Sequence, residues 1–306
     1  APEVDRRMSP ADIVLAMAAV FLGGPTLWSL AMVVRSPRWS GPRSAWDWSL
    51  SLASALAYAL AFNVVFFIQE LFLVVPKALT PGLKPTLFHN NHSWSGQNPL
   101  AELFQGTGAL ATVIVGVAFA VWATRRAPRA LGLRLFVTWM PLLGLLEALP
   151  QVLIGTVIPQ NDVGRAMTYL QLHEVAKVAA SAAALAAMAL ACGLATPLVL
   201  SLVPGAEAQG PRGRARTVFR YAVLPALLAV ALIVPFRLPG APIEVLFPPA
   251  VATLVAATWL QAWSWHAPRA PAGAPSRNWT LPSLLAALIA LLAIFQIALR
   301  PGVPFF

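Results

Sequence analysis

The chain has 306 residues, of which 58% are hydrophobic and only 10% are charged, and its mean hydropathy is +0.72. This balance excludes an ordinary soluble globular domain and indicates an integral membrane protein. The net charge of +10 comes from Arg and Lys in short loops, without a basic patch interleaved with aromatics, so we expect contact with anionic lipid and no nucleic-acid partner. The single cysteine, Cys192, excludes a disulfide within the chain and a zinc site built on thiolates.

Apolar stretches long enough to cross a bilayer, roughly 20 residues each, recur along the whole chain. Because backbone polar groups must be satisfied inside the membrane, these spans are expected to be helices packed on one another. The sequence therefore predicts an all-α fold, a polytopic transmembrane helical bundle of about eight spans. The predicted spans cover residues 10–34, 48–76, 99–124, 131–158, 165–203, 218–236, 243–265 and 281–299.

One polar linker, PGAEAQGPRGRAR at 204–216, divides the chain. Before it lies a five-span front portion, 1–203, which holds the polar residues discussed below, and after it a plainer three-span scaffold portion, 217–306. Small residues recur every four positions in spans three and five, which predicts close approach between helices. They are Gly108, Thr112 and Gly116, and then Ala179, Ala183, Ala187, Ala191 and Ala195.

Arginines concentrate in alternate loops, which predicts the orientation of the bundle. The rich loops carry Arg35, Arg38, Arg43, Arg125, Arg126, Arg129, Arg134, Arg212, Arg214, Arg216, Arg220, Arg269 and Arg277. These loops are predicted to be cytoplasmic, which places both termini and the loops at 85–94 and 158–167 outside. We expect a protein of the bacterial inner (plasma) membrane, surrounded by lipid bilayer and, as an open alternative, by other membrane subunits.

Ionisable side chains within the spans gather toward the predicted outer face. Each is a candidate functional residue, because a charge inside a bilayer costs a few kcal/mol even on insertion scales. We interpret them as a polar network in which Glu70 and Glu147 point into the bundle and Gln151 lies one turn from Glu147. The network comprises Glu70, Glu102, Glu147, Gln151, His173, Glu174 and Lys177.

Three of the four histidines, His89, His92 and His173, fall at the same predicted depth as these carboxylates and Asp162. Imidazole and carboxylate are the ligands that zinc or another divalent metal takes when no thiolate is present. One interpretation is therefore a metal site built from His89, His92, His173 and Asp162. The other is that the stretch HNNH at 89–92 is a polar turn bonding backbone groups. Haem is disfavoured, because only His173 is expected to be helical.

Three segments in order resemble the site-2 protease family of intramembrane zinc metalloproteases: QELFL at 69–73, FQGTGALATVIVG at 104–116 and IPQNDVGRAM at 158–167. The resemblance covers about the first 170 residues. It implies that Glu70 is the catalytic general base and Asp162 a metal ligand. Gln69 and Leu73 stand where the family has its zinc histidines, so the resemblance leaves either a fold without proteolysis or replacement ligands from His89 and His92.

Three functions remain open from the sequence. The first is a membrane metallohydrolase, or a degenerate relative of one, with Glu70 as base. The second is a non-enzymatic subunit of a membrane complex, which eleven tryptophans and few polar loops favour. The third is an ion- or proton-coupled transporter that uses Glu70, Glu147 and Lys177 as a relay.

Overall fold

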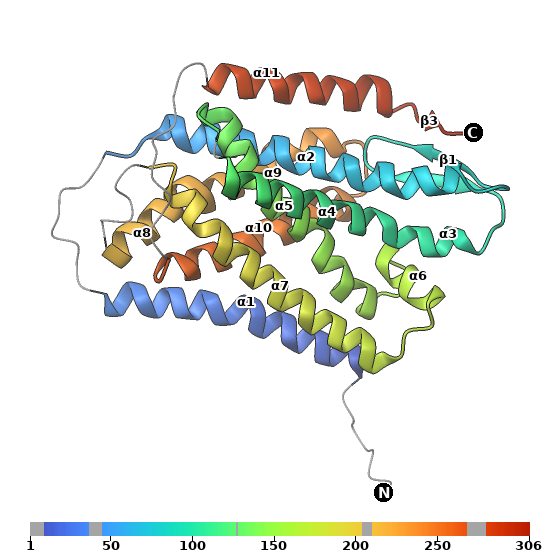
Figure 1. Ribbon diagram of the computed structural model, residues 1–306, viewed down its shortest axis with the longest axis horizontal. Helices are drawn as coiled ribbons and strands as arrows, with labels where there is room; N and C mark the ends of the chain where they lie inside the picture. Colours follow the sequence, from blue (N-terminus) through green and yellow to red (C-terminus); the bar gives the residue numbers. More distant parts are fainter. Residues whose placement is uncertain (1–8, 37–44, 127, 204–209, 268–279) are drawn as a thin grey trace, which may run out of the picture.

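The computed structural model describes residues 9–36, 45–126, 128–203, 210–267 and 280–306, which form a helical bundle with three short strands at one end (Figure 1). Eight helical segments of this part are long and apolar enough to cross a membrane, so the predicted all-α bundle is confirmed. Four of the arginines used for the orientation, Arg38, Arg43, Arg269 and Arg277, lie outside the described residues.

Five of the eight spans are single helices, and three are compound. The single ones are α1 (Pro10–Arg35), α2 (Trp48–Ala78), α5 (Leu131–Val157), α7 (Glu174–Leu200) and α10 (Pro242–Ser264). The compound ones are α3 (Leu100–Leu103) with η1 (Phe104–Gly106) and α4 (Thr107–Arg125), then α8 (Gly210–Val218) with η3 (Phe219–Val223) and α9 (Leu224–Arg237), then α11 (Thr280–Ala293) with η4 (Ile294–Leu299). The short elements are α6 (Asp162–Tyr169), β1 (Lys84–Leu87), β2 (His92–Ser95) and β3 (Val303–Pro304).

Helices α2 and α5 form the centre of the bundle, whereas α1 and α11 lie at its margins and expose most of their apolar surface (Figure 1). The crossing of α4 and α5 is close because glycines meet there. A Cβ atom at Gly144 would lie 2.6 Å from the Cα of Gly116 and 2.7 Å from the carbonyl oxygen of Thr112. The predicted small-residue packing of the third span is therefore confirmed.

The predicted fifth span, 165–203, is wrong at its beginning. Residues 162–169 form the separate helix α6, and a turn with Gln171 at a φ of 53° leads into α7. The side chain of Asn161 accepts a hydrogen bond from the Val163 amide and so begins α6. Gly164 lets α6 pack on the end of α5, since a Cβ there would lie 2.8 Å from the carbonyl oxygen of Gly155.

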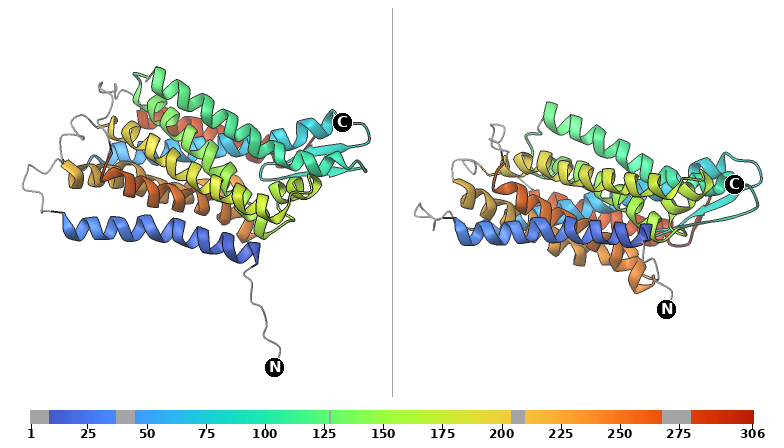
Figure 2. Two further views of the ribbon diagram at one scale, coloured as in Figure 1. Left: turned by 60° about the horizontal axis from the view of Figure 1, so that its bottom comes forward. Right: turned by 90° about the horizontal axis from the view of Figure 1, so that it is seen from below.

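A three-stranded antiparallel sheet, in the order β2-β1-β3, replaces the loop expected after the second span. Leu87 pairs with both His92 on β2 and Val303 on β3, so the C-terminal segment covers one edge of the hairpin. Both further views show the sheet projecting from one end of the bundle (Figure 2). We call this end, which also carries α3 and α6, the hairpin end, and the opposite end, where α8 lies, the arginine end.

The second half of the predicted linker, 204–216, is helical in the structure. Residues 210–216 belong to α8, and residues 204–209 lie outside the described part of the chain. Helix α9, from the rear portion, packs against α2 from the front portion. The front and rear portions therefore pack against each other.

Candidate functional site at the hairpin end

The last turns of α2 bring a carboxylate and an amine into the bundle. Glu70, Leu73 and Lys77 follow one another at helical spacing on one face, and they are only 6%, 1% and 0% exposed. The burial of Glu70 agrees with the prediction that this carboxylate points inward. Lys77, which the sequence places in a loop-like position near the span end, instead lies within the protein.

The central contact of the site is a hydrogen bond between Glu70 and His92. Glu70 Oε2 lies 2.9 Å from His92 Nδ1, and each side chain is 7% exposed. Strand β2 positions His92, and Trp94, two residues later on the same face of the strand, stacks on its ring at 5.8 Å with an interplanar angle of 12°. A buried carboxylate thus fixes the orientation of a buried imidazole, which is the arrangement that general acid–base catalysis uses.

The other ring nitrogen of His92 faces an amide and an amine. Nε2 lies 3.1 Å from Gln105 Oε1 and 3.4 Å from Lys77 Nζ. Lys77 also donates to the Leu73 carbonyl at 2.8 Å and to Gln105 Oε1 at 3.3 Å. With Nδ1 bonded to Glu70, Nε2 of His92 has both an acceptor, Gln105 Oε1, and a donor, Lys77 Nζ, within hydrogen-bonding distance.

Helix α6 completes the site from the other side. Asp162 is largely buried, and this burial, reinforced by the negative charge of Glu70, raises its pKa to about 6, while His92, Lys77 and Arg165 oppose the shift. Arg165 Nη1 lies 3.4 Å from Glu102 Oε1, and both side chains are partly exposed. The guanidinium of Arg165 lies 5.9 Å from the centre of the Trp94 ring, and Lys77 Nζ lies 4.6 Å from it.

His89 lies apart from these residues, in the turn that joins β1 to β2. Its ring is buried, and this burial lowers its pKa, with smaller contributions from the charges of Arg300 and Arg237. The neighbouring Asn90 donates to the carbonyl oxygens of Arg237 and Pro239 at 3.1 and 3.2 Å. Asn90 therefore anchors the tip of the hairpin on the end of α9, as the interpretation of HNNH as a polar turn expects.

His173 precedes the first residue of α7 and is exposed, as is Glu174, which pairs with Lys177 at 2.8 Å. Among the described residues, no group of three or more His, Cys, Asp and Glu side chains could hold a metal ion. The structure places Asp162 within electrostatic range of Glu70 and His92 but does not gather the four predicted ligands His89, His92, His173 and Asp162 into one site. Uptake of zinc or another divalent ion stays a prediction.

Deeper in the bundle, α5 contributes two of the predicted polar residues. Gln151 Nε2 donates to Gln69 Oε1 and to the carbonyl oxygen of Glu147, each at 2.8 Å. Glu147 is 8% exposed, and neither of its carboxyl oxygens has a hydrogen-bond partner. Both residues point into the bundle, as predicted, and Gln69 links this deeper level to the neighbouring Glu70.

Sequence reasoning missed Gln105, Trp94 and Arg165 as members of the site. Gln105 could have been predicted from the sequence, because an amide side chain within a membrane span needs a buried hydrogen-bond partner just as a charged side chain does. Trp94 and Arg165 could not have been predicted, since their roles depend on how β2 and α6 meet α2.

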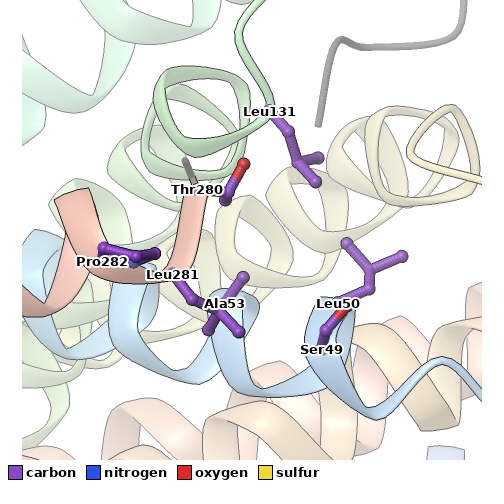
Figure 3. A pocket seen from close by; sticks show the side chains of 7 residues that line it. All are labelled: Ser49, Leu50, Ala53, Leu131, Thr280, Leu281 and Pro282. Atoms are coloured by element: carbon purple, nitrogen blue, oxygen red, sulfur yellow. The ribbon is translucent and has the colours of Figure 1, made fainter. Parts of the chain in front are cut away.

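A pocket of about 400 Å³ lies at the opposite, arginine end of the bundle (Figure 3). Its lining is Ser49, Leu50, Ala53, Leu131, Thr280, Leu281 and Pro282, at the beginnings of α2, α5 and α11. This lining contains no acid, base or charged group, so the pocket is separate from the polar site. Comparison with protein families, curated proteins and solved structures finds no family model, no curated protein and no solved structure that matches this chain.

Proposed function

We propose that this integral membrane protein is a hydrolase whose hairpin-end site uses the Glu70–His92 pair as its general acid–base without a resident metal ion. The observation that carries the proposal is the 2.9 Å contact between Glu70 Oε2 and His92 Nδ1 with both side chains 7% exposed. Buried titratable pairs oriented in this way are more often functional than structural when they lie within a membrane protein.

The residues at this position do not fit the zinc site that the site-2 protease resemblance implies. Leu73 stands at a ligand position, is 1% exposed, and packs where Gly108 approaches α2. Lys77 Nζ lies 3.4 Å from His92 Nε2, so an ammonium group already occupies the side of the ring that an ion would need. We therefore assign the positive charge of the site to Lys77.

The proposed chemistry needs only these side chains. The Glu70–His92 pair removes a proton from a water molecule, whose oxygen attacks the carbonyl carbon of an ester or amide. The negative charge that develops on the carbonyl oxygen is stabilised by the Lys77 ammonium. His92 then returns the proton to the leaving group, so that one water is consumed and the site regains its initial protonation state.

The depth of the site along α2 supports a location near the membrane boundary. Glu70 lies about two helical turns before the end of α2, and Glu102 and Arg165 at its rim are partly exposed. The positive-inside distribution of arginines favours an outward-facing hairpin end in a bacterial inner membrane. We infer that the substrate bond is presented at the outer membrane boundary.

Incorporation of ¹⁸O tests the activity whichever ester or amide is the substrate. Purified protein in lipid nanodiscs is incubated in H₂¹⁸O with a library of unstructured peptides and, separately, with a phospholipid extract, and the products are analysed by mass spectrometry. We expect ¹⁸O-labelled products that a chelator leaves unchanged and that decrease by ~100-fold or more in Glu70→Gln, the effect of removing a general base. Equal product formation by wild type and Glu70→Gln would refute the proposal.

A further inference from the structure

Glu147 and Arg237 are two buried groups of opposite charge that both have unused hydrogen-bonding capacity. They are 8% and 4% exposed, neither carboxyl oxygen of Glu147 has a partner, and neither has Arg237 Nη1. The remaining nitrogens of Arg237, Nε and Nη2, donate to the carbonyl oxygen of Glu244 at 3.0 and 2.7 Å. The two side chains are close enough to influence each other electrostatically, but they form no salt bridge.

The position of Glu147 along the membrane follows from the register of α5 on α2. Trp139 donates to Ser54 Oγ at 3.1 Å, and Gln151 donates to Gln69 Oε1 at 2.8 Å, so the two helices run in the same direction. Glu147 lies one turn before Gln151 and hence about one turn deeper than Gln69 and the neighbouring Glu70. Gln151 is bonded to the Glu147 backbone carbonyl and to Gln69, which precedes Glu70 on α2. Arg237 lies within electrostatic range of both Glu147 and Glu70.

Few other charges surround Glu147. Tyr58 of α2 lies within electrostatic range, but its hydroxyl is bonded to Thr253 at 2.9 Å. Arg237 of α9 is also influenced by Glu70 and Glu244. The charged residues of the other helices that pack on α5 lie near helix ends: Asp12 and Arg35 on α1, Arg125 on α4, Asp162 and Arg165 on α6, Glu174 and Lys177 on α7, and Glu244 on α10.

From these placements we propose that Glu147 is a proton-binding site within the membrane core that exchanges its proton with the Glu70–His92 pair. A carboxylate without any donor in the bundle interior would be strongly disfavoured, and the carboxylic acid avoids that cost. When the proton leaves for Glu70 or His92, the remaining carboxylate acquires the unused Nη1 of Arg237 as its counter-charge. The proton is conserved, and only its position changes.

The exchange partner in this inference rests on the proposed function, but the protonation of Glu147 does not. Infrared spectroscopy separates the two, because a protonated carboxyl group has a C=O band distinct from that of a carboxylate and the band shifts when its proton is exchanged for deuterium. Neither the position of the C=O band nor its shift on deuterium exchange requires a substrate. Failure to find hydrolysis would therefore leave the result for Glu147 intact.

We expect wild-type protein in nanodiscs at neutral pH to show a protonated carboxyl band that disappears in the nearly isosteric Glu147→Gln. The exposed Glu244→Gln is the matched control and should retain the band. A hydrophobic carbodiimide, which reacts with protonated carboxyl groups in apolar surroundings, should give a mass-spectrometric adduct at Glu147. Identical spectra of wild type and Glu147→Gln, with no adduct at this residue, would overturn the proton site.

Proton exchange between Glu147 and the Glu70–His92 pair is tested by the rate at which the C=O band of Glu147 shifts in deuterated solvent. In Glu70→Gln the band of Glu147 should persist but exchange ~10-fold or more slowly, because a proton acceptor at the hairpin end has been removed. Glu244→Gln should exchange at the wild-type rate. An unchanged rate in Glu70→Gln would overturn the exchange with the Glu70–His92 pair.

Discussion

Lys77 places a positive charge inside the site that the sequence predicts to contain a metal ion. Its Nζ contacts the Leu73 carbonyl, Gln105 and His92, which accounts for the hydrogen-bonding capacity of an ammonium group. The sequence could not reveal this, because a lysine seven positions after Glu70 and next to Pro76 reads equally well as the last exposed residue of a span. Only the hairpin, folded back over α2, encloses it.

The sequence predicts those members of the candidate site that can be recognised by their depth in the membrane. Glu70 and Asp162 were identified from the cost of charge in a span and from the resemblance, and the structure places them in one electrostatic environment with His92. His89 and His92, three residues apart, were expected to converge on one ion. Instead, His89 lies in the turn between β1 and β2, whereas His92 begins β2 and pairs with Leu87, so the two rings are separated.

The pKa of Asp162 leads to a prediction of stability against pH. Because burial raises this pKa from 3.8 to about 6, the folded protein binds a proton more tightly than the unfolded chain does. The free energy of unfolding should therefore fall as pH rises from about 4 to about 6 and then level off. Asp162→Asn should remove this decline and stabilise the protein at pH 7 by up to ~3 kcal/mol, at 1.36 kcal/mol per pKa unit.

Thermal unfolding of wild type and Asp162→Asn in the same detergent, at several pH values between 4 and 8, measures this difference. The partly exposed Glu102→Gln provides a carboxylate control from the rim of the site. A pH profile that Asp162→Asn leaves unchanged would show that this carboxyl group is not responsible.

At the scale of elements, the long helices were predictable and the short ones were not. A stretch of 20 or more apolar residues has only one stable form in a bilayer. The four-residue strands β1 and β2 have no such constraint, and β1 acquires its second partner, β3, from the far end of the chain. The predicted fifth span begins at residue 165, whereas the Asn161 cap and the turn at Gln171 make α6 a separate helix.

The crossing of α4 and α5 gives a prediction at this scale. A side chain at Gly144 would meet the backbone of Gly116 at 2.6 Å, and backbone atoms cannot move aside as a flexible side chain can. Gly144→Val should lower the free energy of unfolding by about 1–3 kcal/mol or prevent folding. The control is Gly23→Ala on α1, where an added Cβ would meet nothing within 4 Å.

Thermal melts followed by size-exclusion chromatography in detergent compare the two glycine variants with wild type. We expect early aggregation for Gly144→Val and a wild-type profile for Gly23→Ala. Equal stability of the two variants would mean that α4 and α5 do not cross at these glycines.

For the whole molecule, hydropathy predicts the number of spans but not their arrangement. Spans that are apolar on all sides do not reveal which of them are central. Helices α2 and α5 occupy the centre because they bear the polar side chains Glu70, Glu147 and Gln151, which must be kept from lipid. The margins are left to α1 and α11, whose ionisable residues lie only at their ends or are absent.

The orientation of the bundle is tested by cysteine labelling in intact cells. The native Cys192 is buried and gives little background. Gln97 at the hairpin end and Arg129 at the arginine end are both exposed, which makes them a matched pair. An impermeant maleimide should label Gln97→Cys directly and Arg129→Cys only after permeabilisation, as the arginine distribution predicts. The reverse pattern would place the hairpin end in the cytoplasm.

The metal content of the purified protein shows whether Lys77 or a metal ion is the cation of the Glu70–His92 site. Protein prepared without chelator is analysed by mass spectrometry for zinc, iron, manganese and other divalent metals, alongside His92→Ala. We expect much less than one ion per chain in both preparations. One bound ion per wild-type chain that is lost in His92→Ala would contradict this expectation.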